Sequence, residues 1–318
     1  MPARIIFMGT PDFAVPPLKA LIESANEKNW EVVAVVTQPD RPKGRGKQLA
    51  PPPVKIIAEA AGINVLQPPT LRTEEAVADL AALRPDIIIV AAFGQILRQN
   101  VLDMPPHGCL NIHASLLPRW RGATPVTAAI RAGDAETGIT LMKMGAGLDT
   151  GPMIAQRSLP ILPTHTGETL TEELAELGAA LLVDTLPGWL AGKITPQPQD
   201  DLLATLAPSL KKQEGAIDWS QSAAEIERQV RAFHPWPGTF TESPRGRLKI
   251  ITVKVAAQVS PPAGSIPGTV FKHQREVYVA AGQGVIHLLT VQPAGKKPMD
   301  ALALLNGQPE LLGAQLGN

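Results

Sequence analysis

The sequence has almost no cysteine and no net charge. Its single cysteine, Cys109, excludes an internal disulfide and a zinc site built from cysteines. Lys and Arg together number 29, as do Asp and Glu, so the chain carries no global basic field for nucleic acid. Binding of that kind must therefore rely on local patches. Because Cys109 lies in an apolar, strand-like run, we expect it to be a small core residue and not a nucleophile.

Long apolar segments and nucleotide-binding motifs are also missing. No uninterrupted apolar run approaches ~20 residues, and the N-terminus lacks a signal-peptide pattern. We therefore expect a cytoplasmic protein with no membrane partner. Residues 9–12 contain one glycine where a dinucleotide fingerprint needs three, and no P-loop sequence occurs. The histidines lack metal-site spacing, so no metal is expected either.

Length and composition predict a folded protein with a substantial core. The chain has 318 residues, of which 44% are apolar and 18% are charged. Proline is abundant: 32 residues are about double the usual ~5% share. Many of these prolines are clustered, which is typical of rigid loops and helix starts.

Strand and helix signals alternate through the first two thirds of the chain. Short β-branched runs alternate with amphipathic segments, which predicts a doubly wound, Rossmann-like α/β sheet of mostly parallel strands. The predicted strands span residues 4–8, 32–36, 87–91, 109–113, 139–144 and 153–159, and the predicted helices span residues 15–24, 54–61, 73–83 and 169–190. This part, residues 1–191, is the predicted N-terminal domain.

The composition changes in the last third. Residues 192–208 are polar and dotted with proline, which is typical of a linker. In residues 209–318, a helix near residues 223–232 precedes short alternating runs punctuated by glycine and proline, a pattern that predicts a small barrel or sandwich. This segment has 12 Lys or Arg against 8 Asp or Glu, a local basic excess.

Three side chains in the first two thirds suggest acyl-transfer chemistry. Side chains alternate along a strand, so Asn111 and His113 project from the same face at a strand end. Asp149 lies in a glycine-rich turn, residues 145–151. An amide, an imidazole and a carboxylate suffice for acyl transfer without a covalent intermediate. Considered alone, however, His113 is as easily structural, and Asp149 fits an ordinary turn.

A cluster of cations follows the second predicted strand. Arg41, Lys43, Arg45 and Lys47 fall within seven positions, separated by proline and glycine. Most such runs are solvated surface loops. The functional alternative is a contact with an anion or nucleic acid, in which the glycines allow a close approach of the backbone.

Residues 115–122, with the sequence Ser-Leu-Leu-Pro-Arg-Trp-Arg-Gly, follow an Asn-x-His pattern and carry a family resemblance. This combination resembles the folate-dependent formyltransferases that act on glycinamide ribonucleotide or methionyl-tRNA. Further motifs are similar to the methionyl-tRNA branch of that family and occur in the same order, at residues 9–14, 37–42, 44–46, 148–151, 231–238 and 289–297. The resemblance covers nearly the whole chain.

The resemblance implies a substrate pair and a set of functional residues. The formyl donor would be 10-formyltetrahydrofolate, and the acceptor would be the amino group of methionyl initiator tRNA. Asn111, His113 and Asp149 match the family's catalytic residues, with His113 either accepting the amine proton or holding positive charge. Residues Ser115, Leu116, Leu117 and Pro118 match its folate-binding loop.

The basic loop and the C-terminal segment also match the family. Arg45 matches the arginine of a loop that enters the acceptor arm of the tRNA, which makes Arg41, Lys43 and Lys47 candidate tRNA contacts. The C-terminal segment resembles an OB-like β-barrel domain that holds tRNA. The family resemblance also favours a monomer.

Other functions fit parts of the same pattern. Transfer to a small amine would need neither the basic loop nor the extra domain. Hydrolysis of formyltetrahydrofolate is usually accompanied by an additional N-terminal regulatory domain, which is not evident here. A non-catalytic tRNA-binding module would not need Asn111, His113 and Asp149 together. The sequence therefore favours formyl transfer to methionyl-tRNA.

Overall fold

The computed structural model describes residues 1–43 and 48–317, which fold as two compact units. The first unit comprises Met1–Pro125, Glu136–Pro160 and Leu170–Ala207. The second comprises Val126–Ala135, Ile161–Thr169 and Pro208–Asn318. Asn111, His113 and Asp149 therefore all belong to the first unit.

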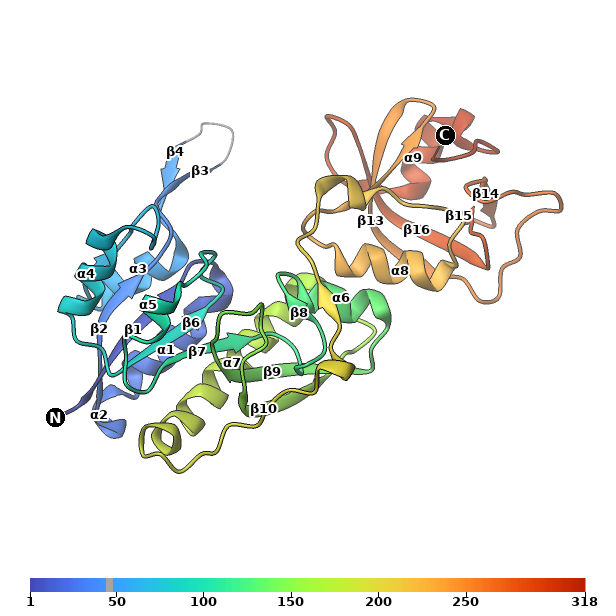
Figure 1. Ribbon diagram of the computed structural model, residues 1–318. Helices are drawn as coiled ribbons and strands as arrows, with labels where there is room; N and C mark the ends of the chain where they lie inside the picture. The colour runs from blue at the N-terminus through green and yellow to red at the C-terminus, as the bar shows by residue number, and fades with distance from the viewer. Residues whose placement is uncertain (44–47, 318) are drawn as a thin grey trace. The chain divides into compact units, whose positions relative to one another are not determined.

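The first unit is built on a seven-stranded sheet in the order β10-β9-β7-β6-β1-β2-β5 (Figure 1). Strands β7, β6, β1, β2 and β5 pair in parallel, whereas β9 and β10 are antiparallel to their neighbours. The strands are β1 (Ala3–Gly9), β2 (Trp30–Val36), β5 (Val65–Leu66), β6 (Ile87–Ala91), β7 (Cys109–His113), β9 (Glu136–Lys143) and β10 (Met153–Pro160). The predicted mostly parallel α/β sheet is confirmed.

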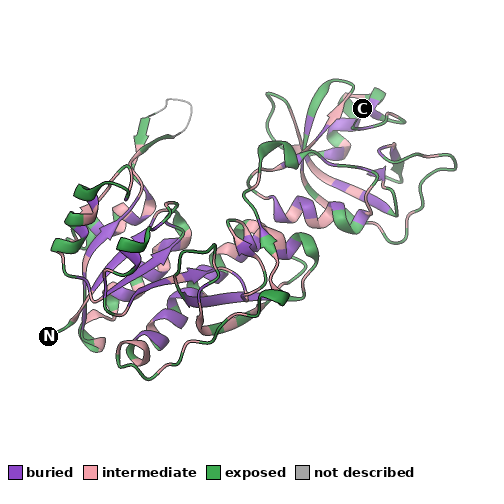
Figure 2. Ribbon diagram, viewed as in Figure 1, coloured by how far each residue is buried: buried purple, intermediate pink, exposed green. Residues whose placement is uncertain are grey.

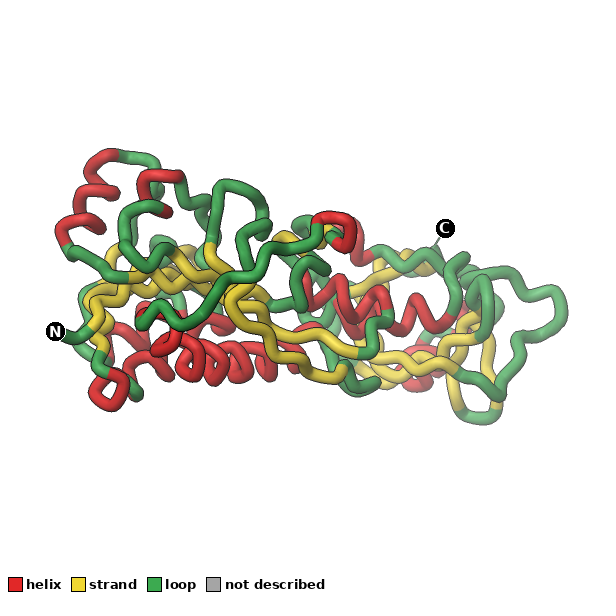
Figure 3. The backbone as a smooth tube through the Cα atoms, turned by 60° about the horizontal axis from the view of Figure 1, so that its bottom comes forward, coloured by secondary structure: helices red, strands yellow, loops and turns green. Residues whose placement is uncertain are grey.

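Helices cover both faces of this sheet, and Figure 3 shows them on either side of the strands. Helices α4 and α5 pack on the face that contains Met8 and Val90. On the opposite face α7 approaches β7 so closely that a Cβ atom at Gly178 would lie 2.9 Å from Cγ2 of Ile112. The helices are α1 (Val15–Glu23), α2 (Ala25–Lys28), α3 (Pro53–Ala60), α4 (Glu74–Ala82), α5 (Gln99–Leu102) and α7 (Gly167–Leu190), with 3-10 turns η1 (Asp12–Ala14) and η2 (Asp201–Leu203).

Local sequence signals account for several helix starts. Helix α3 begins at Pro53, whose ring presets the backbone for the first helical turn. Helix α4 is capped by Thr73, whose hydroxyl accepts a hydrogen bond from the backbone N–H of Ala76 at 3.3 Å. The proline cluster therefore marks the start of α3, and the polar cap residue marks the start of α4.

The central strands form the core of the first unit, and Figure 2 shows them as buried. All five residues of β6 are buried. Cys109 on the neighbouring β7 is also buried, and this burial raises the pKa of its thiol to about 12. A thiol that stays protonated at neutral pH is a poor nucleophile, so the prediction of a core cysteine is confirmed.

The second unit is rich in antiparallel strands, as the sequence predicts. Its sheet has the order β12-β13-β16-β15-β14, with β17 also paired to β16. The strands are β12 (Thr239–Ser243), β13 (Gly246–Val255), β14 (Val270–His273), β15 (Glu276–Ala280), β16 (Val285–Pro293) and β17 (Met299–Asp300). Its helices are α6 (Pro125–Ala132), α8 (Ala223–Ala232) and α9 (Ala301–Gly307), with 3-10 turns η3 (Lys212–Gly215) and η4 (Pro309–Leu311).

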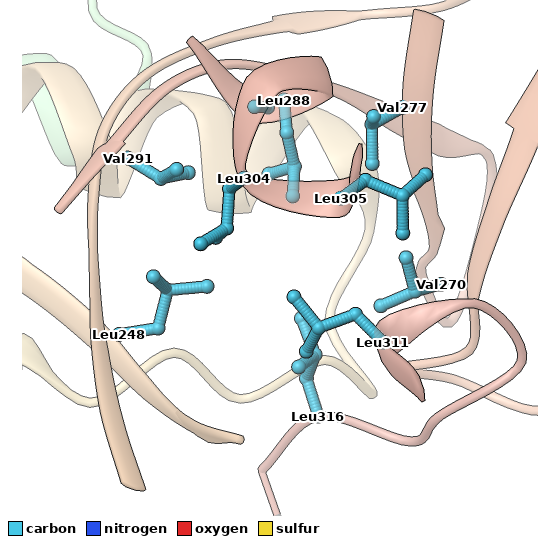
Figure 4. A pocket seen from close by; sticks show the side chains of 10 residues that line it. Leu248, Val270, Val277, Leu288, Val291, Leu304, Leu305, Leu311 and Leu316 are labelled. Atoms are coloured by element: carbon cyan, nitrogen blue, oxygen red, sulfur yellow. The ribbon is translucent and has the colours of Figure 1, made fainter. Parts of the chain in front are cut away.

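Leucine and valine side chains fill the core of the second unit. Figure 4 shows how Leu248, Leu304 and Leu311 converge there with the valines of the sheet. The space left between these side chains is about 10 Å³. A water molecule needs roughly 10–15 Å³, so this gap is a packing feature of the core with no room for a ligand.

The domain boundaries at residues 1–191, 192–208 and 209–318 stay a prediction. Residues 192–207 fall within the first compact unit, where Gln197 and Met153 exchange backbone hydrogen bonds of 2.8 Å. Conversely, α6 and residues 161–169 fall within the second unit. There Arg231 Nη1 donates to the carbonyl oxygen of His165 at 2.8 Å.

Membrane insertion by a helix has no support in the described residues. Across residues 1–43 and 48–317, no helix is both long enough and apolar enough to span a bilayer.

Candidate active site

The candidate site lies at the carboxyl end of β7, in the sheet of the first unit. Asn111 is paired with Val90 of β6 and Met142 of β9, and His113 is paired with Thr140 of β9. Because side chains alternate along a strand, Asn111 and His113 share the face on which Cys109 packs with α4 and α5. In an open α/β sheet, ligands bind beyond the carboxyl ends of the strands, which is where this pair lies.

The imidazole of His113 is held between two partners. The side chain is 6% exposed. Its Nε2 lies 3.0 Å from the carbonyl oxygen of Trp120, and its Nδ1 lies 3.6 Å from Oδ2 of Asp149. Burial lowers the pKa of His113, and the Asp149 carboxylate and the Trp120 carbonyl oppose this effect only in part. This lowered pKa favours the neutral form of the ring.

Asp149 is presented by a turn with an unusual backbone conformation. Its φ is 49°, in the left-handed region that non-glycine residues adopt at a cost. The backbone N–H of Gly122 donates to its Oδ2 at 2.9 Å, and the side chain is 15% exposed. At Gly151, a Cβ atom would lie 1.7 Å from the carbonyl oxygen of Lys143, so this turn requires glycine. The glycine-rich sequence thus serves to bring the carboxylate to His113.

The side-chain amide of Asn111 is the third candidate group. It is half-buried, at the carboxyl end of β7. A half-buried amide next to a buried imidazole on the same strand face can donate to a substrate oxygen with little competition from water. Together, Asn111, His113 and Asp149 form the constellation that the sequence predicts, although their roles stay a prediction.

The segment Ser115–Pro118 is held firmly on strand β9. The hydroxyl of Thr140 donates to the carbonyl oxygen of Ser115 at 2.7 Å and accepts from the N–H of Leu117 at 3.0 Å. Gln156 Nε2 donates to the carbonyl oxygen of Leu117 at 2.9 Å. Ser115 is buried and donates its own hydroxyl to the carbonyl of Arg119 at 2.6 Å. The Ser115 hydroxyl therefore shapes the loop, and Leu116 and Pro118 are the half-buried members of this segment.

Two of the four predicted cationic contacts, Arg41 and Lys43, lie on a strand of a two-stranded hairpin. Strand β3 (Arg41–Lys43) pairs with β4 (Gln48–Ala50). Arg41 is exposed, whereas Arg45 and Lys47 lie outside the described residues. At the base of the hairpin, Lys55 Nζ donates to both carboxylate oxygens of Asp40 at 3.0 and 3.1 Å. Lys55 therefore forms an ion pair within the protein, and this ion pair helps to hold the base of the hairpin.

A pocket of about 440 Å³ opens beside this hairpin. Its walls come from residues that follow β1, β2 and β6 and from a proline cluster. The lining residues include Thr10, Gln38, Arg41, Pro52 and Phe93. Pockets of this size suit a small molecule or one nucleoside of a larger substrate. Because β1, β2 and β6 run parallel to β7, the pocket and His113 both lie at the carboxyl ends of the parallel strands.

The sequence matches two models of one protein family. A model of the formyl transferase family matches residues 3–186, and a model of the formyl transferase C-terminal domain matches residues 209–309. The first match alone covers more than half of the chain.

The chain belongs to the formyl transferase family.

Relatives within this family match the chain from end to end. A methionyl-tRNA formyltransferase of Marinobacter nauticus is 48% identical over 97% of this chain and 97% of its own length. A methionyl-tRNA formyltransferase of Roseiflexus sp. is 49% identical over 100% of this chain and 96% of its own length. The resemblance stated from the sequence motifs is therefore confirmed.

Solved structures of formyl transferases share the fold. A sugar 3N-formyl transferase solved in the presence of dTDP and 5-N-formyl-THF has a TM-score of 0.67 and 17% identity, covering 93% of this chain and 100% of that chain. Methionyl-tRNA formyltransferase from Clostridium thermocellum has a TM-score of 0.56 and 19% identity, covering 81% and 95%. At these identities the similarity concerns the fold alone.

In this formyl transferase, sequence reasoning missed two side chains near Asp149. Gln199 Nε2 donates to the carbonyl oxygens of Asp149 and Gly151, and Arg121 Nε donates to Gln199 Oε1. Gln199 lies in the segment that the composition predicts as a linker. A lone glutamine in a polar, proline-rich stretch has no periodic pattern, so the sequence holds no signal that would have identified it.

The titratable side chains offer no evident metal centre. Within the parts of the chain that the structure describes, no group of three or more His, Cys, Asp or Glu side chains is placed to hold a metal ion.

Proposed function

We propose that this protein transfers the formyl group of 10-formyltetrahydrofolate to the α-amino group of methionyl initiator tRNA. The product would be N-formylmethionyl-tRNA, which is used in translation initiation. The observation that carries this proposal is the end-to-end similarity to methionyl-tRNA formyltransferases, at 48% identity over 97% of both chains. The geometry around His113 supports it, because the groups there fit attack of an amine on a formyl carbon.

The candidate residues divide the chemistry between them. The bound folate supplies a formyl carbon on N10, and the amine of the acceptor attacks it, forming one C–N bond before the bond to N10 breaks. Asn111 donates its side-chain N–H to the formyl oxygen, where negative charge develops. One such donor is worth roughly 3–4 kcal/mol in comparable oxyanion sites. The half-buried position of Asn111 strengthens this interaction by limiting competition from water.

His113 and Asp149 manage the proton in this proposal. The carbonyl of Trp120 can only accept a hydrogen bond, so Nε2 of neutral His113 carries the hydrogen and Nδ1 has a free lone pair. Nδ1 takes the proton that the attacking amine loses, and the same proton then passes to N10 as the folate departs. Asp149, 3.6 Å from Nδ1, stabilises the imidazolium while it exists.

Folate binding is assigned to the loop of Ser115, Leu116, Leu117 and Pro118. Its backbone is fixed by Thr140 and Gln156, so little conformational freedom is lost when a ligand docks. A rigid loop next to His113 in the chain suits a donor whose reactive nitrogen must be placed within bonding distance of the acceptor.

Binding of the tRNA is assigned to the basic hairpin and to the C-terminal part of the chain. Arg41 and Lys43 lie on β3, and Arg45 and Lys47 follow them in the sequence. The cations on β3 suit phosphate contacts, which position a nucleic acid without reading its bases. Residues 209–318, as a separate OB-like domain after a linker at 192–208, would supply a further basic surface.

We further propose that the enzyme acts as a cytoplasmic monomer. Both substrates in this proposal are soluble, and initiator tRNA is charged and used where translation occurs. Sedimentation of the purified protein over a range of concentrations tests the monomer, because a dimer would show a mass near twice the 33.7 kDa of one chain.

A transfer assay tests the proposed function. The protein is offered 10-formyltetrahydrofolate with methionyl initiator tRNA and, in parallel, with methionyl elongator tRNA. We expect formylation of the initiator at a far higher kcat/KM than of the elongator. Equal rates would remove the tRNA discrimination, and transfer only to a small sugar amine would replace the proposed acceptor.

A further inference from the structure

Residues 199–207, here called the bridging segment, lie against the loop that follows the proposed folate-binding residues. Strand β11 (Leu206–Ala207) pairs in parallel with β8 (Arg121–Gly122). Thr205 Oγ1 accepts from the backbone N–H of Trp120 at 2.9 Å, and the carbonyl of Thr205 accepts from the N–H of Arg121 at 2.9 Å. The bridging segment thereby holds the residue whose carbonyl contacts His113.

The same segment also holds the turn that carries Asp149. Gln199 Nε2 donates to the carbonyl oxygen of Asp149 at 2.8 Å and to that of Gly151 at 2.7 Å. Gln199 Oε1 accepts from Arg121 Nε at 2.9 Å. Only this orientation of the amide satisfies all three contacts, because both carbonyls can only accept and the guanidinium can only donate.

Arg121 anchors Gln199 from the other side. The Arg121 side chain is 7% exposed, and its Nη2 donates to Oδ1 of Asp201 at 2.7 Å. The next residue, Gly122, donates its backbone N–H to Oδ2 of Asp149 at 2.9 Å. The Arg121–Gly122 strand thus holds the carboxylate of Asp149 directly, and it holds the main-chain carbonyl of Asp149 through Gln199.

This support matters because of the backbone at Asp149. Its φ of 49° lies in the left-handed region, which a non-glycine residue adopts at some cost, so contacts from its surroundings help to hold the turn. Relaxation would move the carboxylate, which lies 3.6 Å from Nδ1 of His113. A group that fixes the two carbonyls of this turn therefore controls the distance between the two side chains.

We propose that Gln199 is a positioning residue for the proposed formyl transfer, acting through the turn of Asp149. This inference rests on the proposed function. Gln199 orders the turn so that the carboxylate faces the imidazole, and Arg121 fixes Gln199. The bridging segment is then part of the catalytic apparatus and not a passive connection.

Two substitutions separate this role from simple structural support. Gln199→Met keeps the volume and removes all three hydrogen bonds. Gln199→Glu keeps an acceptor for Arg121, and so keeps that link to β8, but removes both donors to the carbonyls of the turn. Gln197→Met is the matched control, because the Gln197 side chain is exposed and, within residues 1–43 and 48–317, donates only to the carbonyl of Thr195.

Steady-state kinetics with methionyl initiator tRNA is the first readout. We expect Gln199→Met and Gln199→Glu to lower kcat about tenfold or more, with each KM changed less than twofold and with Gln197→Met unaffected. In an Asp149→Asn background, Gln199→Met should lower kcat less than twofold, since the group it positions is already lost. The inference would be overturned if Gln199→Met lowered kcat by the same factor in the wild-type and Asp149→Asn backgrounds. A normal kcat for both Gln199 variants would also overturn it.

NMR titration of the His113 ring protons is a second readout that needs no turnover. Asp149 and the Trp120 carbonyl are the groups that raise the pKa of His113 against its burial. If the turn relaxes, the carboxylate moves away, so Gln199→Met should lower that pKa whereas Gln197→Met should not. An unchanged His113 pKa in Gln199→Met would overturn the inference, whether or not the wild-type enzyme formylates methionyl-tRNA. Failure of the wild-type enzyme to formylate methionyl-tRNA would by itself contradict only the proposed function.

Discussion

The carbonyl oxygen of Trp120 lies 3.0 Å from Nε2 of His113 and fixes which ring nitrogen carries the hydrogen. A carbonyl has no hydrogen to donate, so the neutral ring must donate from Nε2 and keep its lone pair on Nδ1. Trp120 itself has a φ of 61°, a conformation that lets its carbonyl turn back to the strand end. The lone pair therefore lies on the side of Asp149, where a proton accepted from the substrate would be stabilised.

Removal of the Asn111 amide should slow the chemical step. Asn111→Ala deletes the donor that faces the developing negative charge, and a single donor of this kind is worth about 10²–10³-fold in kcat. The exposed Asn100 on α5 provides a control, and Asn100→Ala should leave kcat unchanged. Single-turnover kinetics measures the effect, and a kcat within threefold of wild type would exclude Asn111 from the mechanism.

The protonation of His113 should respond to Asp149 in a defined direction. Burial lowers the pKa of His113 below its ordinary value of about 6.5, and the Asp149 carboxylate raises it in part. Asp149→Asn removes that negative charge, so the His113 pKa should fall further and the imidazole should protonate only at lower pH. Ring-proton NMR measures this directly. A rise of the pKa in Asp149→Asn would contradict the charge relationship.

Thr140 should support the proposed folate-binding loop through its hydroxyl. Thr140→Val leaves the N–H of Leu117 without its 3.0 Å acceptor, which costs about 1–3 kcal/mol of folding free energy for a buried donor. We also expect a several-fold higher KM for the formyl donor, because the loop is less fixed.

Thr137, on the same strand, provides a matched control for Thr140. It is also buried, but in the described residues its hydroxyl has no hydrogen-bond partner. Thr137→Val should therefore be neutral or stabilising. Urea unfolding and donor KM values test both variants, and equal losses in the two would rule out a specific role for the Thr140 hydroxyl.

Arg41 should contribute to tRNA binding through charge. It is exposed on β3, and Arg41→Ala should raise the KM for initiator tRNA while leaving kcat nearly unchanged. Loss of one phosphate contact should also reduce the slope of log affinity against log salt by about 1. The equally exposed Arg72 is the control. An unchanged slope of log affinity against log salt in Arg41→Ala would show that Arg41 is a solvent-exposed side chain without a phosphate contact.

Much of the fold follows from local features of the sequence. Buried β-branched runs and amphipathic segments predicted the central strands and the main helices, because burial on both faces of a parallel sheet requires continuous apolar residues. Short elements escaped prediction. Strands β8 and β11 have two residues each, too few for any periodic pattern, and they exist only because they pair with each other.

That Asn111 and His113 share a face at a strand end follows from the sequence, since alternation along a strand is a local property. The 3.6 Å approach of Asp149 to His113, and the contact of Gln199 with the turn of Asp149, arise from the folded structure. These residues come from separate loops, and local patterns contain no information about which loops meet. Such contacts depend on how the whole sheet and its connections pack, and that packing brings distant polar groups together.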